Sequence, residues 1–234
     1  MITVGLKPSS GLWGRSQILL LCGLCCSRGL AAEPRPASIG SPSVDVEHGY
    51  VQVTDLKFTH LTTNDGLSQG YVVDILQDRR GFMWFATRDG LNRYDGYSFV
   101  VYKHDPKDPG SLSSNFIQDL LEDDRGYLWV ATNDGVNRFD PTTERCTRYR
   151  HDPDNPDTLG GASVKSVAQD GHGNLWFGTE DGGLDGLDPR LGTFTHHRND
   201  SEGRFVGRIT QVIEDHHGDI WFTGEHGLFL LRRD

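Results

Sequence analysis

The strongest pattern along this chain is a run of consecutive apolar residues around a tryptophan, with polar turn residues on each side. The first run is Met83-Trp84-Phe85-Ala86, which lies between turns that contain Gly81 and Gly90. The run returns around three further tryptophans, Trp129, Trp176 and Trp221. Successive tryptophans are 45, 47 and 45 positions apart, a period that is typical of repeat architectures.

Each repeat contains four short segments with strand-forming composition, joined by turns. In the first repeat these segments are residues 71–77, 82–87, 91–94 and 97–102. The Asp-Gly pair at positions 89 and 90 suits a primed hairpin turn, whose central residues need positive φ. The second and third repeats follow the same plan, and the fourth stops at Asp234 after its third strand.

Four strands in about 45 residues, without helical periodicity, are typical of one blade of a β-propeller. Apolar residues fall on both faces of the second strand, so each blade must be covered on both sides, as it is between two neighbouring blades. The sequence therefore predicts an all-β propeller of four-stranded antiparallel blades, with about four blades present. We expect the tryptophans, at about 200 Å2 each, to be the main residues that fill the space between blades.

The residue two positions after each tryptophan is small in every repeat, and we expect it to clear space beside the indole. These residues are Ala86, Ala131, Gly178 and Thr223. A further strand signal at residues 57–61 resembles the fourth strand of the third repeat, which the last repeat lacks. If residues 57–61 completed the last blade, the chain would close a four-bladed ring without a free edge. The alternative is that the chain is the first part of a larger propeller.

The first 32 residues have the composition of a secretory leader. Lys7 and Arg15 form a basic start, residues 18–26 an apolar segment, and residues 29–32 the small residues that signal peptidase needs. The apolar segment is shorter than the roughly 20 residues of a membrane span. An uncleaved anchor and a lipid-modified cysteine are the alternatives. We expect a signal peptide at 1–32, a Pro- and Ser-rich linker at 33–56, propeller repeats at 57–234 and a periplasmic location.

Composition excludes several classes of partner and chemistry. The chain has 33 acidic and 23 basic residues, and the repeats contain no Lys/Arg cluster, so nucleic acid is not an expected partner. Three of the four cysteines lie in the leader, which leaves Cys146 without a partner for an intrachain disulfide.

No motif of the sequence predicts an active site or a metal site. Adjacent histidines at 196–197 and 216–217 would point to opposite faces of a strand or lie in a turn, and His104 and His151 recur in equivalent connections between blades. No nucleophile elbow, phosphate loop or zinc motif is present. We therefore expect no catalytic residue, no bound metal, no cofactor and no enzymatic activity in this chain.

One position varies within an otherwise constant frame, just before each hairpin turn. A fixed scaffold with varied residues at the strand ends can bind a small polar ligand, so we take these residues as candidate ligand-binding residues. They are Arg88, Asn133, Glu180 and Glu225. The repeated turn glycines are structural candidates beside the tryptophans; they are Gly81, Gly126, Gly173 and Gly218.

The repeated strings Asp-x-x-Gly-x-Leu/Met/Ile-Trp-Phe/Val and Asp-Gly-Leu/Val-Asn-Arg-Tyr/Phe-Asp, with the opening residues 61–68, resemble the two-component regulator propeller repeat of bacterial sensors. The match covers residues 57–234. The resemblance implies an exported propeller of the seven-bladed type and therefore favours a truncated chain. It also implies a downstream β domain, a transmembrane helix and a histidine kinase or diguanylate cyclase output, with a homodimer as one form of the full-length protein.

The third and fourth repeats depart from the family pattern, because Gly186-Leu187 and Phe229-Leu230 stand where the Asn-Arg pair is expected. The family's ligand residues therefore have no secure counterpart here, and the output cannot be assigned, because the sequence lacks everything that follows the fourth repeat in the family. In several members the input is a carbohydrate. Our leading hypothesis is a ligand-sensing input module. The alternatives are a propeller lyase, which needs His104, His151 and Glu180 to converge, and a protein-interaction scaffold.

Overall fold

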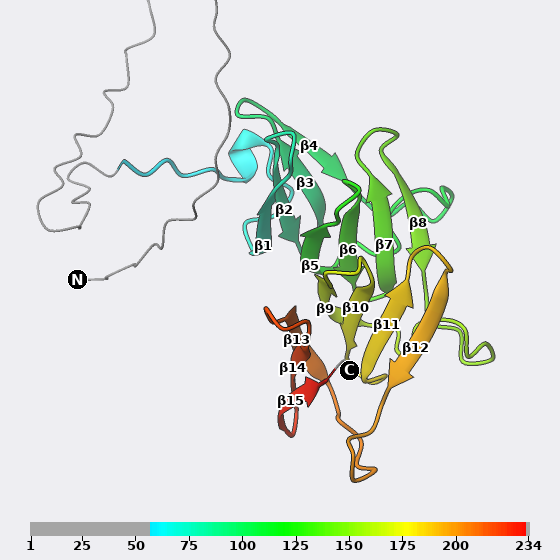
Figure 1. Cartoon of the computed structure of the whole chain (residues 1–234). Helices are drawn as coiled ribbons and strands as arrows, with labels where there is room; N and C mark the ends of the chain where they lie inside the picture. Colours follow the sequence, from blue (N-terminus) through cyan, green and yellow to red (C-terminus); the bar gives the residue numbers. More distant parts are fainter. Residues whose placement is uncertain (1–56, 233–234) are drawn as a thin grey trace, which may run out of the picture. The chain divides into compact units, whose positions relative to one another are not determined.

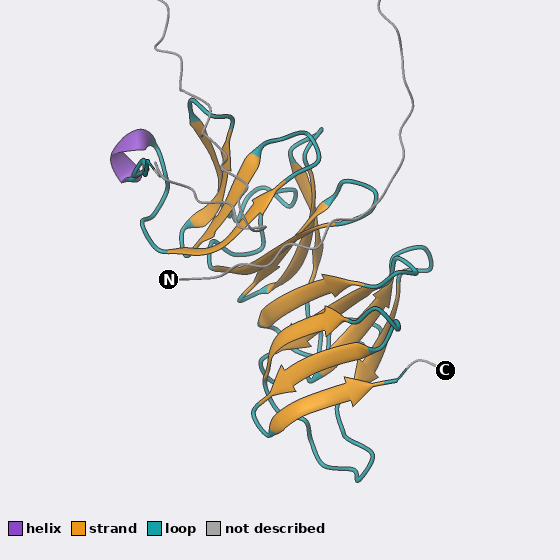
Figure 2. Cartoon of the chain, turned by 60° about the vertical axis from the view of Figure 1, so that its left-hand side comes forward, coloured by secondary structure: helices purple, strands orange, loops and turns teal. Residues whose placement is uncertain are grey.

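The computed structural model describes residues 57–232, and almost all regular structure in them is β-sheet (Figure 1). A single 3₁₀ turn, η1 (Thr63–Asp65), precedes the first strand, and Figure 2 shows that helix is confined to this turn. The predicted signal peptide and linker, residues 1–32 and 33–56, lie outside the described residues. No helix between residues 57 and 232 is long and apolar enough to cross a bilayer.

The strands form four antiparallel sheets in which consecutive strands pair, and we number these sheets blades 1 to 4. Blade 1 contains β1 (Val72–Gln77), β2 (Met83–Thr87), β3 (Gly90–Tyr94) and β4 (Phe99–Tyr102). Blade 2 contains β5 (Ile117–Glu122), β6 (Leu128–Thr132), β7 (Gly135–Asp140) and β8 (Arg145–Tyr149). Blade 3 contains β9 (Val164–Gln169), β10 (Leu175–Thr179), β11 (Leu184–Asp188) and β12 (Thr193–His197). Blade 4 contains β13 (Ile209–Glu214), β14 (Ile220–Gly224) and β15 (Gly227–Leu231).

The predicted all-β architecture of antiparallel blades is confirmed, and the first strands of successive blades are neighbours. β1 lies against β5, β5 against β9, and β9 against β13. Hydrogen bonds join these strands at one repeated position. The backbone N–H of Leu120 donates to Asp74 Oδ2 at 3.0 Å, and that of Val167 donates to Asp119 Oδ2 at 2.8 Å. Side chains of the first strands therefore tie each blade to the next.

The hydrophobic core consists of three clusters, each between two consecutive blades. Trp84 and Trp129 are fully buried in the first two clusters, and Trp176 is 6% exposed in the third. Trp221 is only partly buried, because no described residues cover its side of blade 4. Burial of a large aromatic side chain stabilises an interface by roughly 2–3 kcal/mol, so the tryptophans contribute strongly to contact between blades.

The reason for the small residue two positions after each tryptophan differs from the expectation. A Cβ atom added at Gly178 would lie 2.5 Å from the side chain of Ile209, on the first strand of blade 4. The space is therefore needed by the next blade rather than by the indole. In blade 3 the residue beside the indole is Gly186, the cross-strand partner of Trp176.

The strand predicted at residues 57–61 does not form. These residues belong to no strand, and Phe58 is 92% exposed. An extended segment without a partner strand gains no inter-strand hydrogen bonds and buries no apolar side chains. Strand-forming composition alone is therefore not enough to form a strand here. In this structure blade 4 therefore has three strands, and residues 57–61 do not complete it.

The hairpin turn between the second and third strands is also not of the predicted primed type. Thr87 pairs with Gly90, so the central residues are Arg88 and Asp89. Glu144 is the one non-glycine with positive φ between residues 57 and 232, which excludes a primed turn at Arg88-Asp89. Gly90, at φ 109°, supplies the left-handed residue after the turn instead.

Candidate functional site

The repeated Asp-x-x-Gly turn is a scaffold that fixes the tryptophan. Asp78 Oδ1 accepts hydrogen bonds from the backbone N–H groups of Arg80 and Phe82, and Asp78 Oδ2 accepts from Trp84 Nε1 at 2.9 Å. The same indole bond recurs in the other blades, as Asp123–Trp129, Asp170–Trp176 and Asp215–Trp221. The four turn glycines, Gly81, Gly126, Gly173 and Gly218, all have φ between 86° and 91°.

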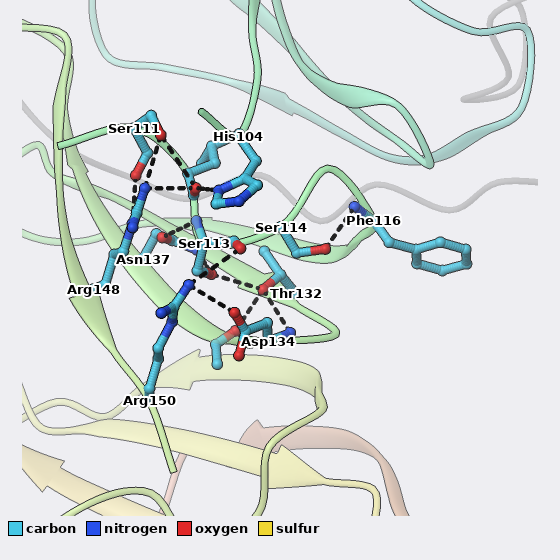
Figure 3. Close-up of polar contacts among 12 residues, drawn as sticks. His104, Ser111, Ser113, Ser114, Phe116, Thr132, Asp134, Asn137, Arg148 and Arg150 are labelled. Atoms are coloured by element: carbon cyan, nitrogen blue, oxygen red, sulfur yellow. Dashed lines mark hydrogen bonds and ion pairs between the residues drawn. The ribbon is translucent and has the colours of Figure 1, made fainter. Parts of the chain in front are cut away.

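A second repeated contact fixes the loop that enters each of blades 1 to 3, as Figure 3 shows for blade 2. Asn137 Oδ1 accepts from the backbone N–H of Ser113 at 2.8 Å, and Ser113 Oγ lies 3.0 Å from Thr132 Oγ1. Blade 1 repeats this arrangement with Asn92, Ser68 and Thr87. The asparagine of the Asn-Arg pair is therefore a structural residue.

The register in blade 3 corrects the sequence alignment of that pair. Phe177 pairs with Asp185 and Trp176 with Gly186, whereas Phe85 pairs with Asn92. The positions equivalent to Asn-Arg are therefore Asp185-Gly186 rather than Gly186-Leu187, because the longer hairpin loop shifts the third strand by one residue. Asp185 Oδ2 still accepts from the backbone N–H of the entering loop, at Gly160.

The four candidate ligand-binding residues lie in these hairpin turns, and the structure does not gather them into one cluster. Three of them instead contact the first strand of their own blade or the segment that enters the next blade. Asn133 Oδ1 accepts from Gln118 Nε2 at 2.7 Å and from Ser163 Oγ at 3.2 Å. Glu180 forms ion pairs with Lys165 at 2.7 Å and Arg208 at 3.3 Å.

Arg88 and Glu225 complete the set. The Arg88 guanidinium lies 4.3 Å from the ring centroid of Tyr71 and 4.9 Å from that of Phe116, just before the first strand of blade 2. Glu225 is exposed, and its backbone N–H donates to the carbonyl of Arg208.

A β-bulge at the start of each first strand explains why the strand reaches the turn residue. The pairing register of each first strand skips one residue, which leaves it without a cross-strand partner. The skipped residues are Val73, Gln118, Lys165 and Thr210. Bulges bend a strand and redirect side chains, and they are common beside binding sites. Sequence reasoning missed these residues, because a bulge depends on pairing with another strand.

The bulged residues of blades 2 to 4 line a polar groove of about 320 Å3. Its lining is Gln118, Asp119, Lys165, Ser166, Val167, Thr210, Gln211 and Val212, from β5, β9 and β13. Amide, hydroxyl, carboxyl and ammonium groups therefore face one space. Such a lining can both donate hydrogen bonds to a ligand and accept them from it.

The charges of the groove largely balance one another. Burial, together with the neighbouring Asp74 carboxylate, raises the pKa of Asp119 to about 6. The hydrogen bond from Lys165 lowers the pKa of Glu180, so this carboxylate stays ionised and offsets the ammonium charge. The groove therefore offers mainly hydrogen-bonding groups rather than a strong net charge.

The histidines that a lyase would need do not converge. His104 Nδ1 lies 2.6 Å from the carbonyl oxygen of Leu112, and His151 Nδ1 lies 2.5 Å from that of Leu159. Both histidines thus hold the loops between blades, while Glu180 pairs with Lys165. Among residues 57–232, no group of three or more His, Cys, Asp or Glu side chains is placed to hold a metal ion.

Comparison with known proteins identifies the repeat and finds similar sequences and folds in two component signalling proteins. The sequence profile of the family described as "Two component regulator propeller" matches residues 66–89, 111–134 and 158–181. Histidine kinase P4 from Formosa agariphila is 46% identical over 61 residues, which are 26% of this chain and 4% of that kinase.

Two solved structures from B. thetaiotaomicron, both described as extracellular domains of hybrid two component systems, have similar folds. The BT3049 domain is 26% identical with a TM-score of 0.59, over 75% of this chain and 30% of that one. The BT4673 domain is 25% identical with a TM-score of 0.63, over 76% of this chain and 24% of that one. The chain therefore spans less than a third of each of these three relatives.

Proposed function

Because this chain carries the repeats of the two-component regulator propeller family, we propose that it is the extracytoplasmic, ligand-sensing input module of a signalling protein. Its similarity to extracellular domains of two component systems and to a histidine kinase supports this role. In this proposal the chain is exported by its signal peptide to the periplasm and forms part of a larger propeller. The output, a histidine kinase or a diguanylate cyclase, follows it in the full-length protein.

The groove across β5, β9 and β13 is the observation that carries the ligand proposal. Its volume of about 320 Å3 falls at the lower end of small-molecule sites. Gln118, Lys165 and Thr210 project into it from bulges, and Gln118 and Lys165 are held in place by the turn residues Asn133 and Glu180. Preorganised donors and acceptors lower the entropic cost of binding a polar molecule.

The chemistry of the lining favours a small polyhydroxylated ligand, so we propose a carbohydrate. Each hydroxyl group of a sugar both donates and accepts a hydrogen bond, which matches the mixed lining of amides, hydroxyls and one carboxyl group. The chain itself performs no catalysis in this proposal. Ligand binding changes the contacts between blades 2, 3 and 4, since all three line the groove.

The proposal is tested by measuring the melting temperature of the chain with a panel of neutral mono- and disaccharides. A ligand at 100 times its dissociation constant adds about 2.7 kcal/mol to the free energy of unfolding. Gln118→Ala and Lys165→Ala should abolish the stabilisation by an active sugar. Tyr97→Ala is the matched control, because Tyr97 is 94% exposed and does not line the groove. Stabilisation that survives both groove variants, or no stabilisation by any sugar of the panel, would contradict the proposal.

A further inference from the structure

Arg88 differs from Glu180, the equivalent charged residue of blade 3, because its side chain contacts aromatic rings and not an oppositely charged group. Its guanidinium lies within 5 Å of two aromatic ring centroids, those of Tyr71 and Phe116. Its backbone N–H donates to Gln69 Oε1 at 3.1 Å, which fixes the turn. A guanidinium interacts with an aromatic ring through its flat face. The Arg88 side chain is exposed, and no hydrogen bond or ion pair joins its guanidinium to another residue between 57 and 232, so its N–H groups can donate to a ligand.

The charge of Arg88 is not neutralised by the described residues around it. Asp89, its neighbour in the turn, pairs with Lys103 at 2.7 Å. The two cations at the corresponding rim of blades 3 and 4, Lys165 and Arg208, both pair with Glu180. Within residues 57–232, no carboxylate lies within ion-pair distance of Arg88. In a chain with a formal net charge of −10, such a cation is available to an external anion.

We propose that the Arg88 guanidinium, supported by Tyr71 and Phe116, binds a carboxylate group of the ligand. The planar fork of an arginine matches the two oxygens of a carboxylate and forms two parallel charge-assisted hydrogen bonds. Aromatic contacts on the faces preorganise the fork, so that less side-chain entropy is lost when the anion binds. The preferred ligand is therefore an acidic rather than a neutral sugar.

The inference that the rest of the ligand is a sugar rests on the proposed function. Phe116 lies two residues before Gln118, the first residue of the polar groove, so Arg88 of blade 1 contacts the segment that leads into the groove. The carboxylate site itself depends only on the three side chains of the arginine cluster, Arg88, Tyr71 and Phe116. Its test can therefore be separated from that of the groove.

The first experiment needs no sugar. The side-chain Nε–H signal of Arg88, assigned through its loss in Arg88→Lys, is followed by NMR during titration of the chain with sodium acetate at constant ionic strength. We expect a saturable shift that Tyr71→Ala weakens and Tyr97→Ala leaves unchanged. Sodium chloride at equal concentration should produce no saturable shift. An Arg88 signal that acetate does not move, or moves no more than chloride does, overturns the carboxylate site.

The second experiment compares glucuronate with glucose by calorimetry. Wild-type chain should bind glucuronate at least about tenfold more tightly, because a bidentate charge-assisted pair is worth more than a neutral hydrogen bond. Arg88→Gln should remove this preference, Arg88→Lys should retain only part of it, and Tyr97→Ala should keep all of it. Equal affinities for both sugars in the wild type would overturn the inference and leave the proposed function intact. Failure of both sugars, with the acetate shift retained, would count against the groove and not against Arg88.

Discussion

The carboxylate of Asp119 accepts a hydrogen bond from the backbone N–H of Val167 at 2.8 Å, across the boundary between blades 2 and 3. Asp74 makes the equivalent bond to Leu120 from blade 1, and Ser166 Oγ accepts from Val212 N–H at 3.1 Å on entry to blade 4. These side chains follow the bulged residues directly in sequence. In blades 2 and 3 the bulged residue and the residue after it both line the polar groove, and the second of them also bonds to the backbone of the next blade.

We predict that Asp119 makes the stability of the propeller depend on pH. Its pKa of about 6 in the folded chain exceeds the ordinary aspartate value of 3.8, so between these values the folded state binds more protons than the unfolded state. The contribution of Asp119 to the free energy of unfolding is therefore largest below pH 4 and falls as pH rises toward 6. The check is urea unfolding at several pH values in the wild type and in Asp119→Asn.

The free energy of unfolding of the variant is subtracted from that of the wild type at each pH, which isolates the contribution of Asp119. Aspartates whose pKa is lowered, such as Asp108 and Asp140, make the chain more stable as pH rises, and their contribution cancels in the difference. Wild type minus variant should decline from pH 4 to pH 6. Parallel profiles would show that the folded-state pKa of Asp119 is ordinary.

The aspartate that binds the indole should matter most where the indole is buried. Asp123→Ala removes acceptors for two backbone N–H groups and for Trp129 Nε1, and leaves the buried indole N–H without a partner. We expect a loss of about 2–4 kcal/mol in the free energy of unfolding. Asp215→Ala is the matched control, with the same contacts to a partly exposed Trp221 that water can reach, and should cost about 1 kcal/mol. Equal losses in the two variants would refute the role of burial.

Gly178→Ala should loosen the contact between blades 3 and 4. The added methyl group would lie 2.5 Å from the Ile209 side chain, so we expect a loss of about 1–3 kcal/mol, measured by chemical denaturation. Gly70→Ala is the control, because a Cβ atom there meets nothing within 4 Å and its φ is not positive. Ile209→Ala removes the Cγ2 atom that the added methyl group would meet, so it should recover part of the loss when combined with Gly178→Ala but should destabilise the wild type. Additive losses would indicate that strain arises elsewhere.

The sequence by itself determined the all-β class, the four repeats and the approximate position of each strand in the blades. The reason is local: apolar residues on both faces, turn residues at fixed offsets and a period of about 45 residues are all read along the chain. The same information located the variable turn residues, Arg88 and its equivalents.

The tertiary structure decided the features that require pairing with another part of the chain, namely which segments form strands, which turn joins them and where the bulges fall. Residues 57–61 have the composition of a strand but lack a neighbour, and the turn at Arg88-Asp89 follows the pairing of Thr87 with Gly90 rather than the Asp-Gly pair. The bulges at Gln118 and Lys165 exist only through pairing with the second strands. A hydrogen-bond ladder and a contact between blades join positions tens of residues apart, and periodicity cannot specify them, because it records which residues are apolar and not which residues they meet.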